Sequence, residues 1–413
     1  MKVAFIVNKF PCLSQSFILD QITSLIARGH EVDIYANELD STSKIHIDVK
    51  KYHLLDKVYY LPSLHKNKIL RFVKGLVLVF TRHYSKPQYL SKLFLERKQY
   101  GIQLLSMRWI YSTIPLIIDK EYDIIHCHFA PNGQKGIVFQ DITDCNSAVV
   151  TTFHGYDVNR INLEQARSTY RQLFQRGNLY TVNSSFTKMK AVALGFPEDK
   201  IVKLPVGLNV SKYSFQAKKL AHGEIVKIIT VARLVEKKGL EYSIKAVAKV
   251  LKSYPNIEYY IVGDGELRPK LLQLIKLLDL DEKVKLLGWM NEEEVRRLYQ
   301  DAHIFILSSV TASDGDMEGQ GLVLQEAQAM GLPVLSTLHN GIPDGVLDGK
   351  SGFLVPEKDV DALAERLQYL IDRPEIWAEM GKVGRDYVEQ HYDINKLSDR
   401  LVKLYQKLLK QKQ

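Results

Sequence analysis

Two acidic residues, Glu318 and Glu326, are eight positions apart in the chain, and Gly321 lies between them. The apolar run that carries Glu326 stops at Gly331 and Pro333, which predicts a helix that begins near Gly321. A rise of about 1.5 Å per residue would place the two carboxylates roughly 10–12 Å apart, with the N–H groups of a helix N-terminus between them. Such N–H groups attract phosphate, so the stretch has the shape of a nucleotide-sugar site. A capped surface helix with two solvated acids would show the same spacing.

Two basic residues, Arg233 and Lys238, flank the loop that follows an expected strand at 228–232. Fixed cations at a strand end can neutralise a diphosphate as it leaves. Hydrogen bonds to charged groups contribute roughly 1.5–3 kcal/mol each, so we expect loss of either cation to affect the transition state more than the fold. Lysines are also common on protein surfaces, and an ordinary solvated loop is the alternative interpretation.

The turn Gly263-Asp264-Gly265 follows another expected strand, at 257–262. It lacks the third glycine of a dinucleotide fingerprint and lies far from the start of the chain, so an NAD site is not expected. Two interpretations stay open for Gly263, a plain turn and a close approach of the backbone to a nucleotide. The sequence also lacks a nucleophile elbow and a P-loop, which disfavours hydrolase, kinase and ATPase chemistry.

The sequence predicts no metal site. Asp314-Gly315-Asp316 resembles a paired-carboxylate clamp, but the glycine and a flanking serine favour a simple loop. His126 and His128 are two positions apart on an expected strand and therefore share a face. A zinc ion would need further ligands, and none occurs at metal-site spacing.

His154 follows the end of an expected strand at 148–152, where a neutral imidazole could hold a sugar hydroxyl. A structural histidine with satisfied hydrogen bonds is the alternative. Polar residues follow other strand ends of the first half as well. Among them, the candidates for contacts with an acceptor are Ser14, Gln15, Asn132 and Asp157.

Strands and helices alternate in both halves of the chain, with a polar, irregular linker at 208–224. Strands are expected at 3–7, 32–36, 124–128, 148–152, 180–182 and 201–204, and then at 228–232, 257–262, 284–287, 302–307, 334–336 and 352–355. Helices are expected at 17–27, 239–252, 266–279, 292–300, 322–330 and 359–371. This pattern predicts two doubly wound, Rossmann-like α/β domains, at 1–207 and 208–390, followed by a last segment at 391–413. We expect their carboxyl strand ends to face each other across a cleft.

The composition is that of a globular chain of 413 residues, which is long enough for two domains. Its three cysteines, Cys12, Cys127 and Cys145, form an odd, unpatterned set, which favours a reducing compartment over a disulfide or zinc framework. The N-terminus lacks the apolar core of a signal peptide, and no apolar stretch reaches the roughly 18 residues of a membrane span. We therefore expect a cytoplasmic protein.

Positive charge is concentrated in the first half of the chain. Residues 1–206 carry 27 Lys and Arg against 17 Asp and Glu, whereas residues 207–413 carry 29 against 30. Residues 66–110 hold ten basic residues against Glu96 alone, interleaved with aromatic and aliphatic side chains. Such a segment can lie on an anionic membrane, which would make the protein peripheral on the inner face of the cytoplasmic membrane. A solvated helix face over the core is the alternative, and no motif supports nucleic-acid binding.

Taken together and in order, these residues resemble the retaining glycosyltransferases of family 4, which have the GT-B fold. The matching positions are the E-x7-E pair, the Arg/Lys pair and a first-domain histidine: Glu318 and Glu326, Arg233 and Lys238, and His154 with Gly155. Further family-like segments are Asn183-Ser184-Ser185 and Gly331-Leu332-Pro333-Val334. Residues 10–17 and 309–318 resemble the branch that builds colanic acid, amylovoran and similar exopolysaccharides.

For the donor, the resemblance implies that Glu318 and the backbone of Gly321, Leu322 and Val323 hold sugar hydroxyls, and that Glu326 binds the ribose. The implied substrate is a nucleotide sugar linked to UDP or GDP, with no cofactor and no metal. Retention in such enzymes is attributed to front-face attack with the leaving phosphate as base. No second catalytic carboxylate of the glycosidase kind is then needed.

The resemblance further implies that Arg233 and Lys238 bind the diphosphate, and that Met290, in the turn at 288–290, meets the base, with Gly263 as a further donor contact. His154 would contact the donor sugar from the first domain. The last helix of the family returns to the first domain, and residues 395–410 are the candidate for it.

This chain departs from the family pattern at Pro11 and Cys12, where many relatives carry glycines, at 205–207, and at Asp344, where a glutamate is usual. These departures affect the acceptor loops and leave the donor site intact. The expected reaction moves a sugar from a nucleotide sugar to a lipid-linked oligosaccharide in exopolysaccharide biosynthesis. The alternatives are a sugar-nucleotide epimerase or phosphorylase of the same fold, and a nucleotide-sugar-binding module without enzymatic activity.

Overall fold

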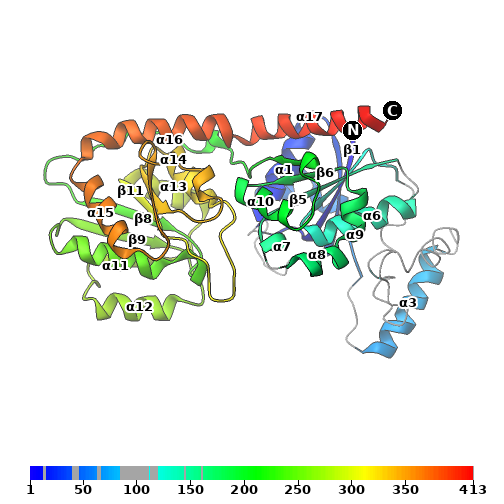
Figure 1. Cartoon of the computed structure of the whole chain (residues 1–413), viewed down its shortest axis with the longest axis horizontal. Coiled ribbons are helices and arrows are strands. Elements are labelled where there is room, and N and C mark those ends of the chain that lie inside the picture. The colour runs from blue at the N-terminus through cyan, green and yellow to red at the C-terminus, as the bar shows by residue number, and fades with distance from the viewer. Residues whose placement is uncertain are drawn as a thin grey trace. The chain divides into compact units, whose positions relative to one another are not determined.

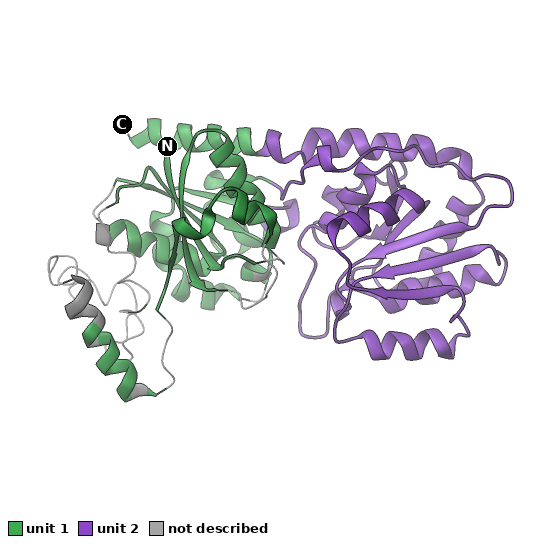
Figure 2. Ribbon diagram, turned by 180° about the vertical axis from the view of Figure 1, so that it is seen from behind, with its two compact units in different colours: residues 1–182, 188–204, 398–413 green, residues 183–187, 205–397 purple. Residues whose placement is uncertain are grey.

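The computed structural model describes residues 1–12, 15–39, 46–62, 67–83, 111, 120–143, 146–159 and 161–412. The chain forms two compact units (Figure 2). Unit 1 comprises Met1–Val182, Lys188–Leu204 and Ser398–Gln413, and unit 2 comprises Asn183–Thr187 and Pro205–Leu397.

In its described part, unit 1 is built on a parallel sheet of seven strands in the order β3-β2-β1-β4-β5-β6-β7. The strands are β1 (Lys2–Lys9), β2 (Glu31–Glu38), β3 (Val58–Tyr60), β4 (Ile124–His128), β5 (Ala148–Phe153), β6 (Leu179–Val182) and β7 (Ile201–Lys203). Every residue of β4, β5 and β6 is buried, which is why these strands show no alternation of buried apolar and exposed polar residues. The edge strand β3 was not predicted, because three half-buried residues give too short a pattern.

Helices connect these strands (Figure 1). Those in the described part of the chain are α1 (Ser16–Ala27), α2 (Ile47–Lys51), α3 (Lys68–His83), α6 (Ala130–Thr143), α7 (Tyr156–Asn159), α8 (Leu163–Thr169), α9 (Arg171–Arg176) and α10 (Ser185–Ala193). Helix α6 packs on β4 and β5 at very short range. A Cβ at Gly133 would lie 2.5 Å from Oγ1 of Thr151, so only glycine allows this approach. The close packing places the start of α6 beside the ends of β4 and β5.

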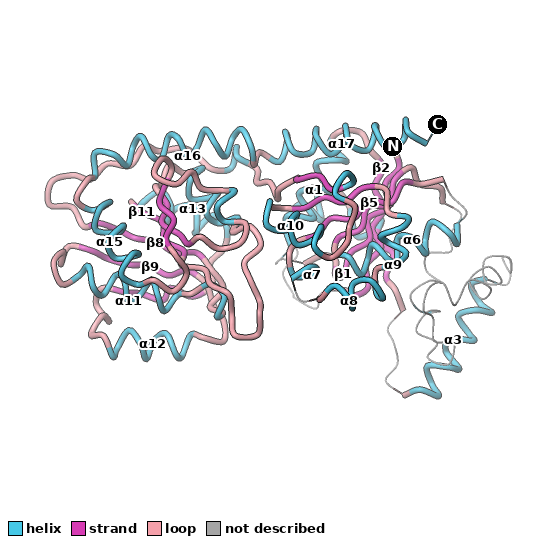
Figure 3. The backbone as a smooth tube through the Cα atoms, viewed as in Figure 1, coloured by secondary structure: helices cyan, strands magenta, loops and turns pink. Residues whose placement is uncertain are grey.

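Unit 2 contains a parallel sheet of six strands in the order β10-β9-β8-β11-β12-β13 (Figure 3). The strands are β8 (Val226–Val231), β9 (Ile257–Val262), β10 (Val284–Gly288), β11 (Ile304–Leu307), β12 (Val334–Thr337) and β13 (Gly352–Val355). The helices are α11 (Leu240–Leu251), α12 (Arg268–Leu277), α13 (Glu292–Asp301), α14 (Leu322–Ala329), α15 (Val360–Ile371) and α16 (Trp377–His391). Helix α11 packs on α15, and α14 packs on α16. The predicted fold class, two doubly wound parallel α/β sheets, is confirmed.

The chain enters unit 2 at Pro205, slightly before the predicted limit at 207, because Val206 is tied to that unit. The Val206 N–H donates to Oε1 of Gln320 at 2.8 Å, and Nε2 of Gln320 donates to the Val206 carbonyl at 2.9 Å. Asn183–Thr187 also belongs to unit 2, where the Ser185 N–H donates to the Asp344 carboxylate at 2.6 Å. Both attachments involve side chains that are remote in sequence.

The last helix, α17 (Ile394–Lys412), begins in unit 2, and its residues from Ser398 onward belong to unit 1. Asp399 pairs with Arg28 at 2.7 Å, and the Tyr405 hydroxyl lies 2.5 Å from Nδ1 of the buried His126. Among the described helices of the chain, none combines the length and the hydrophobicity that crossing a membrane requires.

Candidate functional site

The predicted donor-site residues of unit 2 follow the carboxyl ends of neighbouring strands. Strand β8 is hydrogen-bonded to β9 on one side and to β11 on the other, so the sheet order reverses at β8. In open α/β sheets ligands bind at such a reversal, beyond the carboxyl ends of the strands. Arg233 and Lys238 follow β8, Gly263 follows β9, Met290 follows β10 and Glu318 lies between β11 and α14.

Lys238 and Glu318 are brought into direct contact, although they are far apart in the chain. The Lys238 ammonium forms an ion pair with the Glu318 carboxylate, and their side chains are only 11% and 15% exposed. Burial alone would raise the pKa of the Glu318 carboxyl, but Lys238 and Lys237 together outweigh it and lower the pKa to about 2. Glu318 is therefore ionised at neutral pH and can accept hydrogen bonds only.

Arg233 lies exposed on the same loop, and its guanidinium makes no hydrogen bond or ion pair with the part of the chain that the structure describes. Its neighbours are fixed, because the Ala232 N–H donates to the Val262 carbonyl at 2.9 Å and the Leu234 N–H to the Asp264 carbonyl at 3.0 Å. A guanidinium with unused donors on a held backbone is well suited to bind an anion.

Gly263 has φ of +131°, and a Cβ at this position would lie 1.9 Å from the carbonyl oxygen of Ala232. Its N–H donates to the Gly288 carbonyl at 2.8 Å, which joins the loops after β8, β9 and β10. The Ala232 carbonyl thus makes the close approach at Gly263. A contact between Gly263 and the nucleotide sugar stays a prediction. Met290, two residues beyond Gly288, is half-buried beside this junction.

Helix α14 begins at Leu322, immediately after Gly321, whose φ is +75°. No side chain caps this N-terminus. In the described structure, the N–H groups of Leu322 and Val323 have no acceptor. A Cβ on Gly321 would lie 3.8 Å from Cγ of Glu318, so these N–H groups lie close to the buried ion pair. Free N–H groups and the positive end of a helix favour an anion at this point.

Glu326 lies in the second turn of α14, and its Oε2 accepts a hydrogen bond from the buried Tyr299 hydroxyl at 3.2 Å. Burial raises the pKa of Glu326 to about 7, although hydrogen bonds from Tyr299 and Tyr213 oppose this. The two carboxyl groups of the E-x7-E pair therefore differ strongly in acidity. Opposite surroundings produce this difference, because Glu318 faces two ammonium groups and Glu326 faces two phenols.

Three residues that the sequence pattern did not single out, Lys237, His339 and Glu357, support Glu318, and a fourth, Gln320, lies two positions after it. Lys237 pairs with Asp316 at 3.2 Å, so one acid of the Asp314-Gly315-Asp316 loop is engaged by a cation. Gln320 binds Val206, as described above. His339 and Glu357 hold the Glu318 backbone and are described below. Among the described residues, no group of three or more His, Cys, Asp or Glu side chains is arranged to hold a metal ion.

In unit 1, His154 is the last ring of a stack of three histidines. The ring centroids of His126 and His128 are 4.8 Å apart, and those of His128 and His154 are 5.2 Å apart. Nδ1 of His128 lies 2.9 Å from Nε2 of His154, and Nε2 of His126 lies 2.7 Å from Oγ1 of Thr152. Burial lowers the pKa of His126 and of His154 to about 3, and burial together with the neighbouring histidines lowers the pKa of His128 well below its usual range. All three rings are therefore neutral at neutral pH.

The predicted acceptor residues Asp157 and Asn132 flank this stack. The Asp157 carboxylate accepts the N–H groups of Ala130, at 2.9 Å, and of His154, at 3.1 Å. Burial raises the pKa of Asp157 to about 6, although four backbone N–H groups oppose it. Nδ2 of Asn132 donates to the His128 carbonyl at 2.8 Å. Both side chains thus have structural bonds, and a contact with an acceptor stays a prediction.

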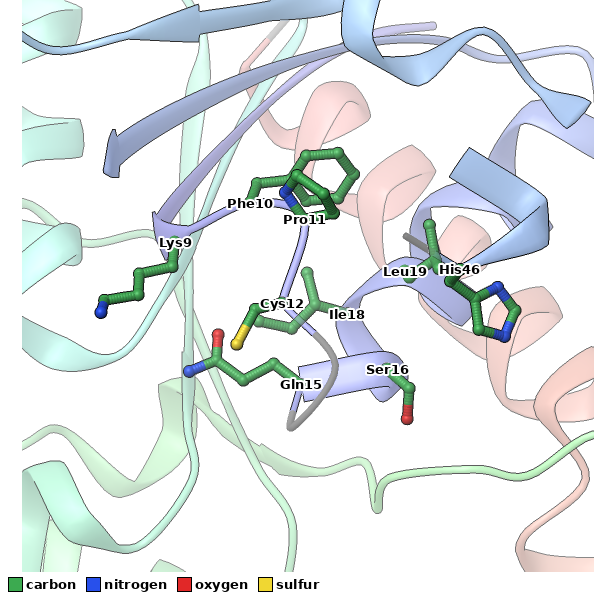
Figure 4. A pocket seen from close by; sticks show the side chains of 9 residues that line it. All are labelled: Lys9, Phe10, Pro11, Cys12, Gln15, Ser16, Ile18, Leu19 and His46. Atoms are coloured by element: carbon green, nitrogen blue, oxygen red, sulfur yellow. The ribbon is translucent and has the colours of Figure 1, made fainter. Parts of the chain in front are cut away.

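Gln15 lies beside a small cavity at the end of β1, which Figure 4 shows. Lys9, Phe10, Pro11, Cys12, Ser16, Ile18, Leu19 and His46 complete the lining. The cavity volume is about 20 Å³, which is room for a water molecule and too little for a sugar ring. Ser14, the other acceptor candidate of this loop, lies outside the described residues.

Comparisons with known proteins point to one family. Residues 77–212 match the family model described as Glycosyltransferase Family 4, and residues 212–387 match that of Glycosyl transferases group 1. The putative colanic acid biosynthesis glycosyltransferase WcaL of Escherichia coli (strain K12) is 34% identical over 413 residues, which are 99% of this chain and 100% of the relative. The amylovoran biosynthesis glycosyltransferase AmsK of Erwinia amylovora is 34% identical over 414 residues, which are 98% of this chain and 100% of the relative. The crystal structure of Anabaena Alr3699/HepE in complex with UDP and glucose has a TM-score of 0.71 at 17% identity, covering 98% of this chain and 100% of that one.

Proposed function

This chain belongs to glycosyltransferase family 4, a family of retaining hexosyltransferases, and we propose that it moves a hexose from a nucleotide sugar to an oligosaccharide in exopolysaccharide biosynthesis. The single observation that carries the proposal is the buried Lys238–Glu318 pair beside the uncapped start of α14, with Glu326 in the next turn. These groups supply a cation, free N–H donors and two carboxyl groups around the start of one helix.

In the proposed reaction, Arg233, Lys238 and the α14 N-terminus share the charge of the leaving diphosphate. An ammonium has three donors, and Lys238 needs only one of them for Glu318. Arg233 uses none of its donors on described residues. Such donors act most strongly in a site shielded from water, where they are already oriented before charge develops.

The two carboxyl groups would bind different hydroxyls of the donor. We assign Glu318, which is ionised and held by Lys238, to the sugar, and Glu326 to the ribose. Hydroxyl groups donate to a carboxylate through charge-assisted hydrogen bonds, each worth roughly 1.5–3 kcal/mol. The assignment of His154 to the donor sugar is part of the same proposal, and its neutral ring suits a hydroxyl ligand.

The acceptor in this proposal is lipid-linked, and helix α3 supports a position on an anionic membrane. Within residues 66–110 the structure describes 67–83 only. Five apolar side chains of α3 are exposed: Ile69, Leu70, Phe72, Val73 and Val77. The segment has ten basic residues and one acidic residue, so its charge complements anionic lipid headgroups.

The test of the proposed reaction is an assay of nucleoside diphosphate release. The protein is incubated with UDP- and GDP-linked hexoses and a lipid-linked oligosaccharide, and the product is followed by chromatography. We expect turnover with one donor, and a loss of at least tenfold in Glu326→Ala. Glu365→Gln, an exposed glutamate of α15, is the matched control.

The alternatives give different results in the same assay. A binding module would bind the donor in calorimetry and release no diphosphate. An epimerase would change the sugar without an acceptor, which nuclear magnetic resonance of the donor would detect. Absence of turnover with every donor, or equal turnover in wild type and Glu326→Ala, would contradict the proposal.

The membrane position has its own test, in which the protein is pelleted with vesicles that contain phosphatidylglycerol. We expect binding that weakens steeply with salt, because exposed charges are screened within about 10 Å at 0.1 M ionic strength. Phe72→Ser and Val73→Ser, on the exposed face of α3, should reduce pelleting. Pelleting that is absent, or independent of salt, would count against a membrane role for α3.

A further inference from the structure

The backbone of Glu318 is held by a buried histidine that belongs to the loop after β12. The Glu318 N–H donates to Nε2 of His339 at 3.0 Å, and the His339 side chain has no exposed surface. Since Nε2 accepts this bond, the ring proton of the neutral histidine must be on Nδ1. Nδ1 lies 2.5 Å from Oε1 of Glu357, which accepts that proton in a hydrogen bond. One carboxylate thereby fixes the tautomer that Glu318 requires.

Two neighbours complete this arrangement. Nδ2 of Asn340 donates to the Glu318 carbonyl at 3.0 Å, so the N–H and the C=O of Glu318 are both bound by adjacent residues of one loop. The Thr311 N–H donates to Oε2 of Glu357 at 2.8 Å, so the second oxygen of this carboxylate is also engaged. Glu357 therefore connects the loop after β11, which leads to Glu318, with the loop after β12, which holds it.

We propose that Glu357 and His339 are positioning residues for glycosyl transfer, which hold Glu318 at the donor sugar through its backbone. This inference rests on the proposed function. Lys238 binds the Glu318 carboxylate, but an ion pair between two loops would not by itself fix where that carboxylate lies. The bonds of His339 and Asn340 supply this restraint, because they fix the peptide from which the side chain extends. A displacement of about 1 Å in a reacting group can cost roughly a hundredfold in rate.

The neutral imidazole is suited to this task because its two nitrogens have opposite roles. Loss of the Glu357 carboxylate would allow the proton to move to Nε2, and two donors would then face each other at Glu318. Glu357 is 28% exposed, so its replacement should leave the fold intact. His339 is buried, and its replacement therefore needs a control of equal structural cost.

His303 provides that control within the same unit. The Lys227 N–H donates to Nδ1 of His303 at 3.0 Å, and Nε2 lies 3.6 Å from Oε1 of Glu224. As at His339, a buried imidazole here lies between a backbone N–H and a glutamate. His303 follows α13 and precedes β11. His303→Leu and His339→Leu each remove one buried acceptor of a backbone N–H, so a purely structural role predicts similar effects for both.

The experiment compares kcat, donor KM and thermal unfolding for His339→Leu, His339→Gln, Glu357→Ala and His303→Leu. We expect His339→Leu and Glu357→Ala to lower kcat/KM at least tenfold, and His303→Leu to lower it less than threefold at a similar loss of stability. The amide oxygen of His339→Gln can replace Nε2 as acceptor, so this variant should recover most of the activity. If His339→Leu does not fold, Glu357→Ala and His339→Gln decide the question alone.

A binding measurement separates this inference from the proposed reaction. Calorimetry with UDP and GDP, and with UDP-glucose and GDP-mannose, needs no acceptor. We expect His339→Leu and Glu357→Ala to weaken binding of the intact nucleotide sugar and to leave binding of its nucleoside diphosphate within about twofold. Equal weakening of both ligands, or kcat/KM values of His339→Leu and His303→Leu that fall alike, would overturn the inference even in an active transferase.

Discussion

Lys238 forms a buried ion pair with Glu318, eighty positions further along the chain, and so joins the loop after β8 to the loop that precedes α14. Against the effect of burial, this contact and the charge of Lys237 lower the pKa of the Glu318 carboxyl to about 2. The adjacent Lys237 forms a parallel pair with Asp316, which is more exposed. The two lysines of one short turn thus bind two acids of one loop, and this doubled contact is the feature on which the first prediction depends.

Lys238→Met should be far more damaging than Lys237→Met. Removal of one partner from a buried pair typically costs about 3–5 kcal/mol, because the other charge stays buried without compensation. Lys238→Met should also lower kcat/KM by roughly a hundredfold, since it removes a proposed diphosphate ligand. Urea unfolding and steady-state kinetics of the two variants test this, and comparable losses in both would show that Lys238 has no special role.

The affinity for the nucleotide should rise as the pH increases through about 7, because Glu326 ionises there. A carboxyl group whose pKa is raised on folding stabilises the fold below its unfolded pKa, and this contribution is lost as the pH rises through the folded pKa. The ionised form, in contrast, is the better acceptor for ribose hydroxyls.

We expect the wild-type affinity for the nucleoside diphosphate to increase roughly three- to tenfold between about pH 6 and pH 8, by calorimetry. The ligand phosphates titrate in part of this range, so the decisive quantity is the difference from Glu326→Gln. That variant should show only the ligand's own pH dependence, and Glu365→Gln should behave as wild type. Identical profiles for wild type and Glu326→Gln would refute the assignment.

The histidine stack of unit 1 should make the protein sensitive to mild acid. Burial lowers the pKa of His126 and of His154 from the usual 6.5 to about 3, and that of His128 well below 6.5. A histidine whose pKa is lowered on folding stabilises the fold above its unfolded pKa, and this contribution is lost as the pH falls. Each of the three histidines should lower the free energy of unfolding by about 1.4 kcal/mol for each pH unit below about 6.5.

Urea unfolding at several pH values between 7.5 and 4.5 measures this loss. His128→Leu removes one titrating ring, so its free energy of unfolding should fall less steeply with acid than that of wild type, by about 1.4 kcal/mol per pH unit. His222→Gln, an exposed position of unit 2, is the control and should keep the wild-type slope. Parallel slopes for His128→Leu and wild type would mean that His128 is already protonated in the fold.

Gly263→Ala should displace the loop that carries Arg233. The new Cβ would lie 1.9 Å from the Ala232 carbonyl oxygen, and φ of +131° is a conformation that only glycine adopts readily. Gly349→Ala is the matched control, because its φ is +70° and a Cβ there meets nothing within 4 Å. The control should lose about 1–2 kcal/mol of unfolding free energy. Gly263→Ala should lose more and also weaken diphosphate binding, and equal effects of both substitutions would contradict the packing argument.

Much of the fold could be predicted from the sequence, because its signals are local. Buried parallel strands are continuous apolar runs, and the helices between them follow from apolar periodicity and from stop signals such as Gly331 and Pro333. The strand that was missed, β3, has three half-buried residues, too few to form a pattern. The spacing of Glu318 and Glu326 and the order of the basic residues likewise follow from the chain, and these features are enough to indicate the family.

The partners of those residues could not be predicted in the same way, because pairing depends on how distant loops meet. Local spacing contains no signal that Lys238 binds Glu318, that Gln320 holds Val206, or that His339 accepts the Glu318 N–H. Local spacing also predicts no difference in acidity between Glu318 and Glu326, whereas their pKa values lie near 2 and near 7. Burial and neighbouring charge determine a pKa, and both arise only when the chain has folded. The sequence alone therefore determined which residues gather at the strand ends of unit 2, and the tertiary structure alone decided which of them are charged, held or free to bind a donor.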